Sequence, residues 1–218
     1  MTNTPKPYHH GNLRRSLLRA AAVSLEAVGP RDLSLRELSR ELGVSHTAPR
    51  RHFADKQQLL DALAQDGYEQ VRIALAEAAA NPPADFTERL TRLALAYVDF
   101  VQRHPALMEL MLTTKHSGNA PHLVEASGLA FAPVLAAIRD GQAAGEVVAE
   151  DPDGVKVLIF ATLLGLAAMS SNGLILGEPL SVSVTRSVRQ IVEGLRPRPE
   201  PHSQARERTS PGSHASIT

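Results

Sequence analysis

Residues 33–63 read LSLRELSRELGVSHTAPRRHFADKQQLLDAL, and this stretch predicts two short helices joined by a tight turn. Leucines recur at helical spacing over residues 35–42, which gives the first helix one apolar face. Ser34 and Glu37 have the types and the spacing of a capping box, in which each side chain bonds to the backbone N–H of the other. Gly43 then allows the positive φ of a sharp corner.

A second helix is predicted to begin after Ser45, a residue suited to an N-cap, and to end near Phe53. Pro49 is placed in its first turn, where a missing N–H costs little. Two short helices around a glycine turn, the second opening on polar and basic residues, are typical of a helix-turn-helix that enters the major groove of DNA. The side chains expected to contact bases or phosphates are Ser45, His46, Thr47, Arg50 and Arg51.

This stretch resembles the DNA-binding domain of the tetracycline-repressor (TetR) family of bacterial regulators, and the resemblance covers about residues 8–65. The matching residues are Ser34, Gly43, Val44, Ser45, His52, Phe53, Lys56 and Leu59. The resemblance adds Ser34, His52 and Lys56 to the residues expected at the DNA, although His52 also suits a capping or packing role. Arg50 stands where the family has tyrosine, which keeps a partner for phosphate but removes an aromatic contact.

The formal net charge of zero hides a basic N-terminal quarter. Residues 1–60 contain ten Lys or Arg and five Asp or Glu, whereas residues 61–218 contain 13 and 18. This asymmetry indicates that the N-terminal part meets an anion. Arg14, Arg15 and Arg19 fit DNA contacts and a solvated helix face equally well.

Metal and catalytic chemistry find little support in the residues. The chain has no Cys, which excludes disulfides, thiolate metal sites and cysteine nucleophiles. His46 and His52 are six residues apart and lie on different faces of a helix, unlike the i, i+4 pair that holds a metal. We therefore expect no metal and no cofactor. Without a nucleophile elbow or a phosphate-binding glycine loop, we also predict that the protein is not an enzyme.

Alanine and leucine dominate the apolar residues, and aromatic residues are only 4% of the chain, so we predict an all-α fold of about nine helices. The first helix is expected to run from an N-cap at Asn12 to Gly29-Pro30, and Asp55 is expected to cap the fourth. The apolar face of the first helix is predicted to consist of Leu17, Ala21, Leu25 and Val28. Later helices are expected at 85–103, 105–114, 120–144, 152–176 and 181–196.

This pattern divides the chain into a head and a body. We predict a flexible arm at 1–11, the helix-turn-helix domain at 12–60 with its fourth helix linking to about 80, a regulatory and dimerisation domain at 81–196, and a disordered tail at 197–218. Several body residues could line a cavity for a small-molecule effector, although each also suits ordinary core packing. They are Tyr97, Phe100, His104, Met108, Met111, His116, Phe131, Phe160 and Met169.

Residues 157–176, VLIFATLLGLAAMSSNGLIL, contain no charge and are long enough to span a bilayer. Polar residues dilute the segment and no Lys or Arg cluster flanks it, so we favour a buried helix or a subunit contact over a membrane span. Helices at about 155–176 and 181–196 are therefore expected to pair with their copies in a homodimer. The polar N-terminus lacks the apolar run of a signal peptide, and we expect a cytoplasmic protein.

The function implied by the resemblance is regulation of transcription. It implies a repressor that binds double-stranded DNA at a palindromic operator as a homodimer and is released by a small ligand. The alternative from another class is a helical membrane-associated or scaffold protein with a basic helix pair, which partition into detergent would favour. A small-molecule enzyme is a third class and would need a reactive group that the sequence does not show.

Overall fold

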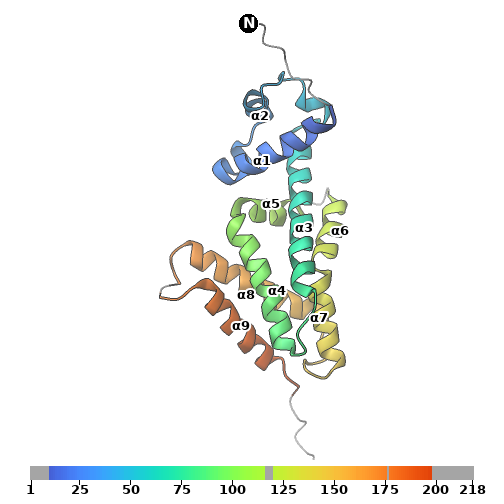
Figure 1. Ribbon diagram of the computed structural model, residues 1–218, viewed down its shortest axis with the longest axis vertical. Helices are drawn as coiled ribbons and strands as arrows, with labels where there is room; N and C mark the ends of the chain where they lie inside the picture. The colour runs from blue at the N-terminus through green and yellow to red at the C-terminus, as the bar shows by residue number, and fades with distance from the viewer. Residues whose placement is uncertain (1–9, 116–119, 176, 198–218) are drawn as a thin grey trace, which may run out of the picture.

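The computed structural model describes residues 10–115, 120–175 and 177–197, and within them the chain forms nine α-helices, one 3₁₀ helix and no strand. The predicted all-α fold of about nine helices is confirmed. The molecule is elongated, with a small head at one end and a larger helical body at the other (Figure 1). The predicted arm and tail lie almost wholly outside the described residues, as does His116.

The head consists of α1 (His10–Asp32), α2 (Leu35–Glu41) and the 3₁₀ helix η1 (Pro49–Arg51), packed around the start of a longer helix. The predicted cap at Asn12 is wrong, because α1 begins two residues earlier and Asn12 lies in its first turn. A kink at Gly29, where φ is 75°, separates the last turn of α1 from the rest of the helix. The sequence predicted that the helix ends at this position. The predicted apolar face is buried as far as Leu25, but Val28 is 47% exposed.

The corner after α2 is closed by Gly43, as the sequence predicts. Gly43 has a φ of 64°, and its N–H donates to the carbonyl of Arg40 at 3.2 Å. The N–H of Val44 donates to the carbonyl of Ser39 at 3.0 Å. These two bonds form a Schellman motif, which satisfies two of the free carbonyls at the helix end and fixes the direction in which the chain leaves.

The two predicted side-chain caps have different outcomes. The carboxylate of Asp55 accepts a bond from the N–H of Gln58 at 2.9 Å, so the cap of the long helix is confirmed. Ser34 has the extended backbone of an N-cap, but its side chain makes no capping bond. Glu37 pairs instead with Arg40 one turn along, at 3.2 Å. The capping box is therefore wrong, because a neighbouring cation competes for the glutamate.

The predicted second helix of the motif forms only a turn followed by η1. The N–H of Ala48 donates to the carbonyl of Ser45 at 3.0 Å, and the N–H of Phe53 donates to that of Pro49 at 2.9 Å. Pro49 explains the difference. In an α-helix the N–H of the fourth residue after Ser45 would make the first bond to the carbonyl of Ser45, and proline has no N–H. A proline at this position therefore removes a helix hydrogen bond, whereas a proline nearer the start of the helix would not.

The body is built around α3 (Lys56–Ala79), which continues from the head and packs against α4, α5 and α6 (Figure 1). The other body helices are α4 (Phe86–Arg103), α5 (Pro105–Lys115), α6 (Pro121–Ala130), α7 (Ala132–Ala143), α8 (Pro152–Ser171) and α9 (Leu180–Gly194). The single helix expected over 120–144 is wrong, since α6 and α7 meet at a bend of 51°. Pro133 causes the break, because it has no N–H to give to the carbonyl of Leu129 and its ring crowds that group.

α8 is apolar on nearly all sides. It is 20 residues long and its most apolar 18 residues have a mean hydropathy of 1.7, so length and composition alone would let it cross a membrane. One face, which includes Ile159 and Leu163, is buried against the body and packs on α4, α7 and α9. The opposite face is exposed and carries Val157, which is 63% exposed, beside the small residues Ala161 and Gly165. Within the described residues this apolar outer face has no cover.

Candidate functional site

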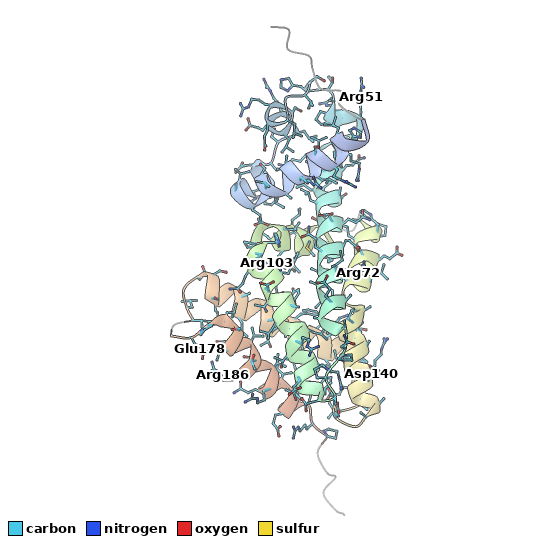
Figure 2. All side chains as sticks on the ribbon, viewed as in Figure 1. Arg51, Arg72, Arg103, Asp140, Glu178 and Arg186 are labelled. Carbon is cyan, nitrogen blue, oxygen red and sulfur yellow. The ribbon has the colours of Figure 1, made fainter. Side chains whose placement is uncertain are left out.

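Five of the predicted DNA-contacting residues form one exposed run in the head. They are Ser45, His46, Thr47, Arg50 and Arg51. Figure 2 places Arg51 at the head end of the molecule, away from the body. Among the ion pairs of the described residues, none involves Arg50 or Arg51. Two adjacent guanidinium groups are therefore presented to solvent with their charges unneutralised, as contact with phosphate requires.

This run is held in place from beneath. Pro49 is buried, and the ring of Phe53 is only 2% exposed. At the start of the run, the hydroxyl oxygens of Ser45 and Thr47 lie 3.2 Å apart in a hydrogen bond. Apolar anchors thus fix the segment to the head while its polar side chains stay outside.

The three further residues predicted for the DNA surface, Ser34, His52 and Lys56, are half-buried. The ammonium group of Lys56 donates to the backbone carbonyl of Arg31, which ties the start of α3 to the last turn of α1. His52 caps η1 through its backbone N–H, which donates to the carbonyl of Pro49 at 2.9 Å. No group of three or more His, Cys, Asp or Glu side chains within the described residues could hold a metal ion.

Arg14 is a residue for which the sequence left two interpretations open. Its guanidinium carbon lies 5.3 Å from the centre of the Phe53 ring, within cation–π range. The contact joins α1 to the segment that follows η1, and it holds an exposed cation of α1 in place. No such ring contact is found for Arg15 or Arg19 among the described residues, and periodicity alone could not separate the three arginines.

In the body, three of the residues predicted to line an effector cavity come together. Tyr97 of α4, Phe131 at the corner between α6 and α7, and Phe160 of α8 contact one another edge to face. Their ring centroids lie 4.5–5.7 Å apart, with Phe131 and Phe160 closest. The hydroxyl of Tyr97 lies 3.8 Å from the sulfur of Met108. Burial raises the pKa of Tyr97 far above its ordinary value, and the nearby Tyr68 adds to this, so the phenol stays neutral.

A polar spot that the sequence did not predict lies beside this cluster. The hydroxyl of Tyr68 donates to the backbone carbonyl of Met111 at 3.1 Å. Burial raises the pKa of Tyr68, and a hydrogen bond with Ser127 partly opposes the shift. Helical spacing marks Tyr68 only as a core residue of α3. A buried hydroxyl pair in an apolar surrounding is what orients a mostly apolar ligand.

The remaining predicted cavity residues divide into buried and exposed ones. Phe100 is buried and stacks at a tilt on His104, with ring centroids 5.1 Å apart. Met111 is fully buried in α5. Met169 is 45% exposed and does not join the cluster. It follows the buried Ala167 by two residues, about 200° around the helix, and so lies on the outer face of α8.

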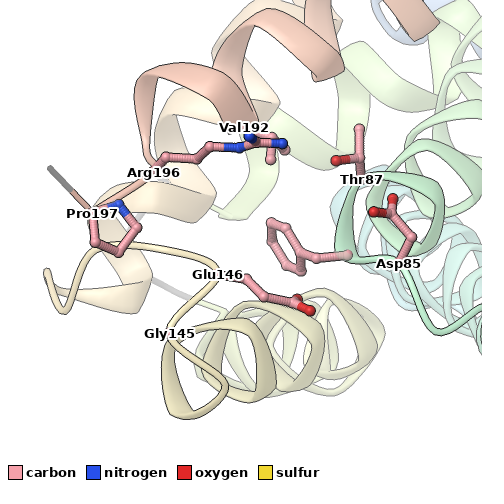
Figure 3. Close-up of a pocket in the computed structure, with 8 residues that line it drawn as sticks. Asp85, Thr87, Gly145, Glu146, Val192, Arg196 and Pro197 are labelled. Carbon is pink, nitrogen blue, oxygen red and sulfur yellow. The ribbon is translucent and has the colours of Figure 1, made fainter.

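Two surface hollows lie apart from the aromatic cluster. One of about 330 Å³ lies between the start of α4 and the end of α9 (Figure 3). Its lining residues are Asp85, Phe86, Thr87, Gly145, Glu146, Val192, Arg196 and Pro197. The other, of about 600 Å³, lies where the head meets α5 and is lined in part by Lys56, Leu60 and Leu110. Neither hollow includes a residue predicted to line the effector cavity.

Two family profiles match the chain, one in each part. Residues 17–63 match the family described as bacterial regulatory proteins, tetR family. Residues 90–195 match the family described as tetracyclin repressor-like, C-terminal domain. Comparison with curated proteins gives no significant match.

Solved structures with a similar fold cover most of the chain. A protein of unknown function from Rhodococcus sp. RHA1 is 39% identical, with a TM-score of 0.81 over 88% of this chain and 100% of that chain. A TetR family transcription regulator from Marinobacter aquaeolei VT8 is 19% identical, with a TM-score of 0.71 over 86% and 97%. The TetR family transcriptional regulator PfmR from Thermus thermophilus is 19% identical, with a TM-score of 0.64 over 83% and 99%. At 19% identity these last two similarities establish a common fold.

Proposed function

The chain belongs to the TetR family of bacterial transcriptional regulators, and we propose that it is a ligand-responsive repressor that binds a palindromic operator as a homodimer. The observation that carries the proposal is the exposed run in the head, in which Arg50 and Arg51 stand side by side beyond the buried Pro49. A surface of this kind suits the phosphates and base edges of a DNA groove. A DNA-binding regulator needs no catalytic group, and the protein is proposed not to be an enzyme.

Some polar residues of the head are proposed to contact DNA bases, and others are proposed to contact the phosphate backbone. Ser45, His46 and Thr47 precede the buried proline and are free to reach base edges in the major groove. Arg50 and Arg51 supply the charge that phosphates attract. Ser34, His52 and Lys56 are proposed as flanking backbone contacts. Lys56 keeps donors for phosphate while it binds the carbonyl of Arg31, because an ammonium group has three N–H donors.

The homodimer is proposed to form through α8 and α9. The outer face of α8 exposes Val157, Leu158 and Met169 around the small residues Ala161 and Gly165. Small residues let two helices approach closely, and an exposed apolar face of this length is typical of a subunit contact. α9 packs beside α8 and is proposed to complete the contact. Two heads held in this way would reach successive major grooves about 34–36 Å apart.

The effector is proposed to bind at the aromatic cluster of Tyr97, Phe131 and Phe160. The rings offer apolar contact area, and Tyr68 and Ser127 offer hydroxyl groups beside it. The effector is therefore proposed to be a small, mostly apolar molecule with at least one polar group. It would release DNA only by binding one conformation of the dimer better than the other.

The proposal is tested by selecting, from random duplex DNA, the fragments that the purified protein binds in the cytoplasmic range of salt. A repressor of this kind enriches a two-fold symmetric sequence. Selection of no sequence, or of sites without symmetry, would contradict it. The protein is proposed to act in the cytoplasm, where its DNA is found.

A further inference from the structure

Helix α5 of the body receives its N-terminal cap from the head. The backbone N–H groups of Ala106 and Leu107 donate to the two carboxylate oxygens of Glu26, at 3.0 and 3.1 Å. Glu26 lies on α1, 80 residues earlier in the chain than Ala106. Bonds from N–H to a carboxylate are stronger than those to neutral acceptors, and a negative charge at a helix start also suits the helix dipole.

Glu26 accepts from the two N–H groups of the first turn of α5 that need an acceptor from outside the helix. Pro105, the first residue of α5, has no N–H. The N–H of Met108 donates to the carbonyl of His104 at 2.9 Å, which is the first bond of the helix. The N–H groups of Ala106 and Leu107 lie between these two positions. Glu26 thus takes the role that a serine or aspartate directly before the helix ordinarily has.

α5 lies between the head and the aromatic cluster. It packs against α1 and α3, and Figure 1 shows it directly beneath α1. On the body side, Met108 of α5 lies beside the hydroxyl of Tyr97, and the carbonyl of Met111 accepts from Tyr68. A displacement of α5 therefore changes contacts at the cluster and at Glu26 together.

We propose that Glu26 is a positioning residue that fixes the head to the body and thereby sets the separation of DNA half-sites that the dimer accepts. Two oxygens bound to two successive backbone N–H groups restrain both the distance and the rotation between α1 and α5. The covalent link from head to body is α3, a single continuous helix that can bend. Without the carboxylate, the head swings more freely about α3. The inference rests on the proposed binding of DNA by a dimer.

The test measures affinity against half-site separation. Full-length protein is titrated into duplexes that carry the selected half-sites at the selected separation and at separations one and two base pairs shorter and longer. The variants are Glu26→Ala, Glu26→Gln and, as a matched loss of one exposed carboxylate, Glu69→Ala. Glu69 binds Arg72 within α3 and does not link head to body.

Wild type and Glu69→Ala are expected to bind the duplex with the selected separation more tightly than the other duplexes, and the ratio of affinities is expected to be the same for both proteins. In Glu26→Ala this ratio of affinities is expected to decrease about fivefold, in line with the loss of one helix cap. Glu26→Gln keeps one acceptor oxygen and is expected to lie between them. Amide hydrogen exchange at residues 106 and 107 is expected to rise in both Glu26 variants while the rest of the head keeps its protection.

The outcomes separate the two proposals. If wild type binds none of the duplexes, the proposed function fails, and this inference with it. If wild type prefers one separation and Glu26→Ala keeps the same preference despite faster exchange at 106 and 107, the function stands and the role of Glu26 is overturned. If Glu26→Ala does not fold, Glu26→Gln decides the question by the same comparison.

Discussion

At the scale of single residues, Pro49 and Arg50 determine what the head presents to DNA. Pro49 removes one backbone bond, so the segment predicted to be a helix is a turn and a single 3₁₀ turn. Arg50 stands where the family has tyrosine, and its side chain is exposed. An arginine at this position adds a charge and five donors where a tyrosine would offer one hydroxyl. At this position the head therefore offers DNA more charge and less aromatic contact than a family member with tyrosine would.

Replacing Arg51 by alanine is expected to weaken DNA binding by about tenfold, since hydrogen bonds to charged groups contribute about 1.5–3 kcal/mol. The plot of log affinity against log salt concentration should become less steep by about 0.9, because one phosphate contact is lost. Fluorescence anisotropy at several salt concentrations measures both. Arg72→Ala is the matched control, because Arg72 lies on α3 and pairs with Glu69. Equal effects of the two substitutions would remove Arg51 from the interface.

Replacing Arg14 by alanine is expected to weaken DNA binding severalfold, whereas Arg19→Ala is expected to have a smaller effect. Both side chains are exposed on α1, but the guanidinium of Arg14 is held over the Phe53 ring. A cation fixed in advance loses less entropy when it binds phosphate. The same anisotropy titration compares them. A larger loss in Arg19→Ala would show that the ring contact only stabilises the head.

At the scale of helices and turns, the sequence predicted most boundaries where one local signal acted alone. Gly43 and Asp55 are examples, since a glycine corner and an aspartate cap depend on few neighbours. Prediction failed where two signals competed. Glu37 was drawn from the capping box by Arg40, and Pro133 divided a stretch whose apolar spacing continued through the break. Periodicity indicates which residues face inward, but it does not indicate which backbone N–H groups are present. Proline breaks a helix because it lacks this N–H.

Replacing Gly43 by alanine is expected to destabilise the protein by about 1–2 kcal/mol, because alanine pays a steric cost at positive φ. A Cβ at Gly43 meets nothing within 4 Å, so the cost comes from the backbone conformation and not from a clash with another group. Gly128→Ala is the matched control: it lies inside α6, its added Cβ also meets nothing, and it should stabilise by about 0.5–1 kcal/mol. Thermal unfolding followed by circular dichroism compares the two. A shift of the same sign in both would contradict the left-handed corner.

At the scale of the whole molecule, the predicted site residues separate into an exposed group in the head and an aromatic cluster in the body. The exposed run in the head could be predicted because basic and polar residues follow a recognisable corner. The aromatic cluster could be predicted only in part, since Tyr97, Phe131 and Phe160 are far apart in sequence and meet only after α6 and α7 bend. Met169 and Tyr68 show the limit of such prediction. Residue type suggested a cavity position for Met169, which lies on the exposed face of α8. Helical spacing marked Tyr68 correctly as a core residue, but it could not show that its hydroxyl bonds to the carbonyl of Met111.

Replacing Leu158 by glutamate is expected to dissociate the dimer at micromolar concentration. A charge in the centre of an apolar contact is buried without a partner when two copies of α8 meet. Leu129→Glu is the matched control, because Leu129 is an exposed leucine of α6, a helix that packs on α3, α5 and α7. Sedimentation velocity of the three proteins measures the change. A monomeric wild type, or a dimer that survives Leu158→Glu, would move the subunit contact elsewhere.

A symmetric pair of these heads is proposed to bind DNA through the charge that the exposed run presents. The most direct measurement is the affinity of the full-length protein for duplex DNA from around its own gene, at a series of salt concentrations. We expect a linear fall of log affinity with log salt, with a slope of about −0.9 for each phosphate contacted, and a stoichiometry of two chains per site. Absence of binding at low salt, or binding that salt does not change, would contradict it.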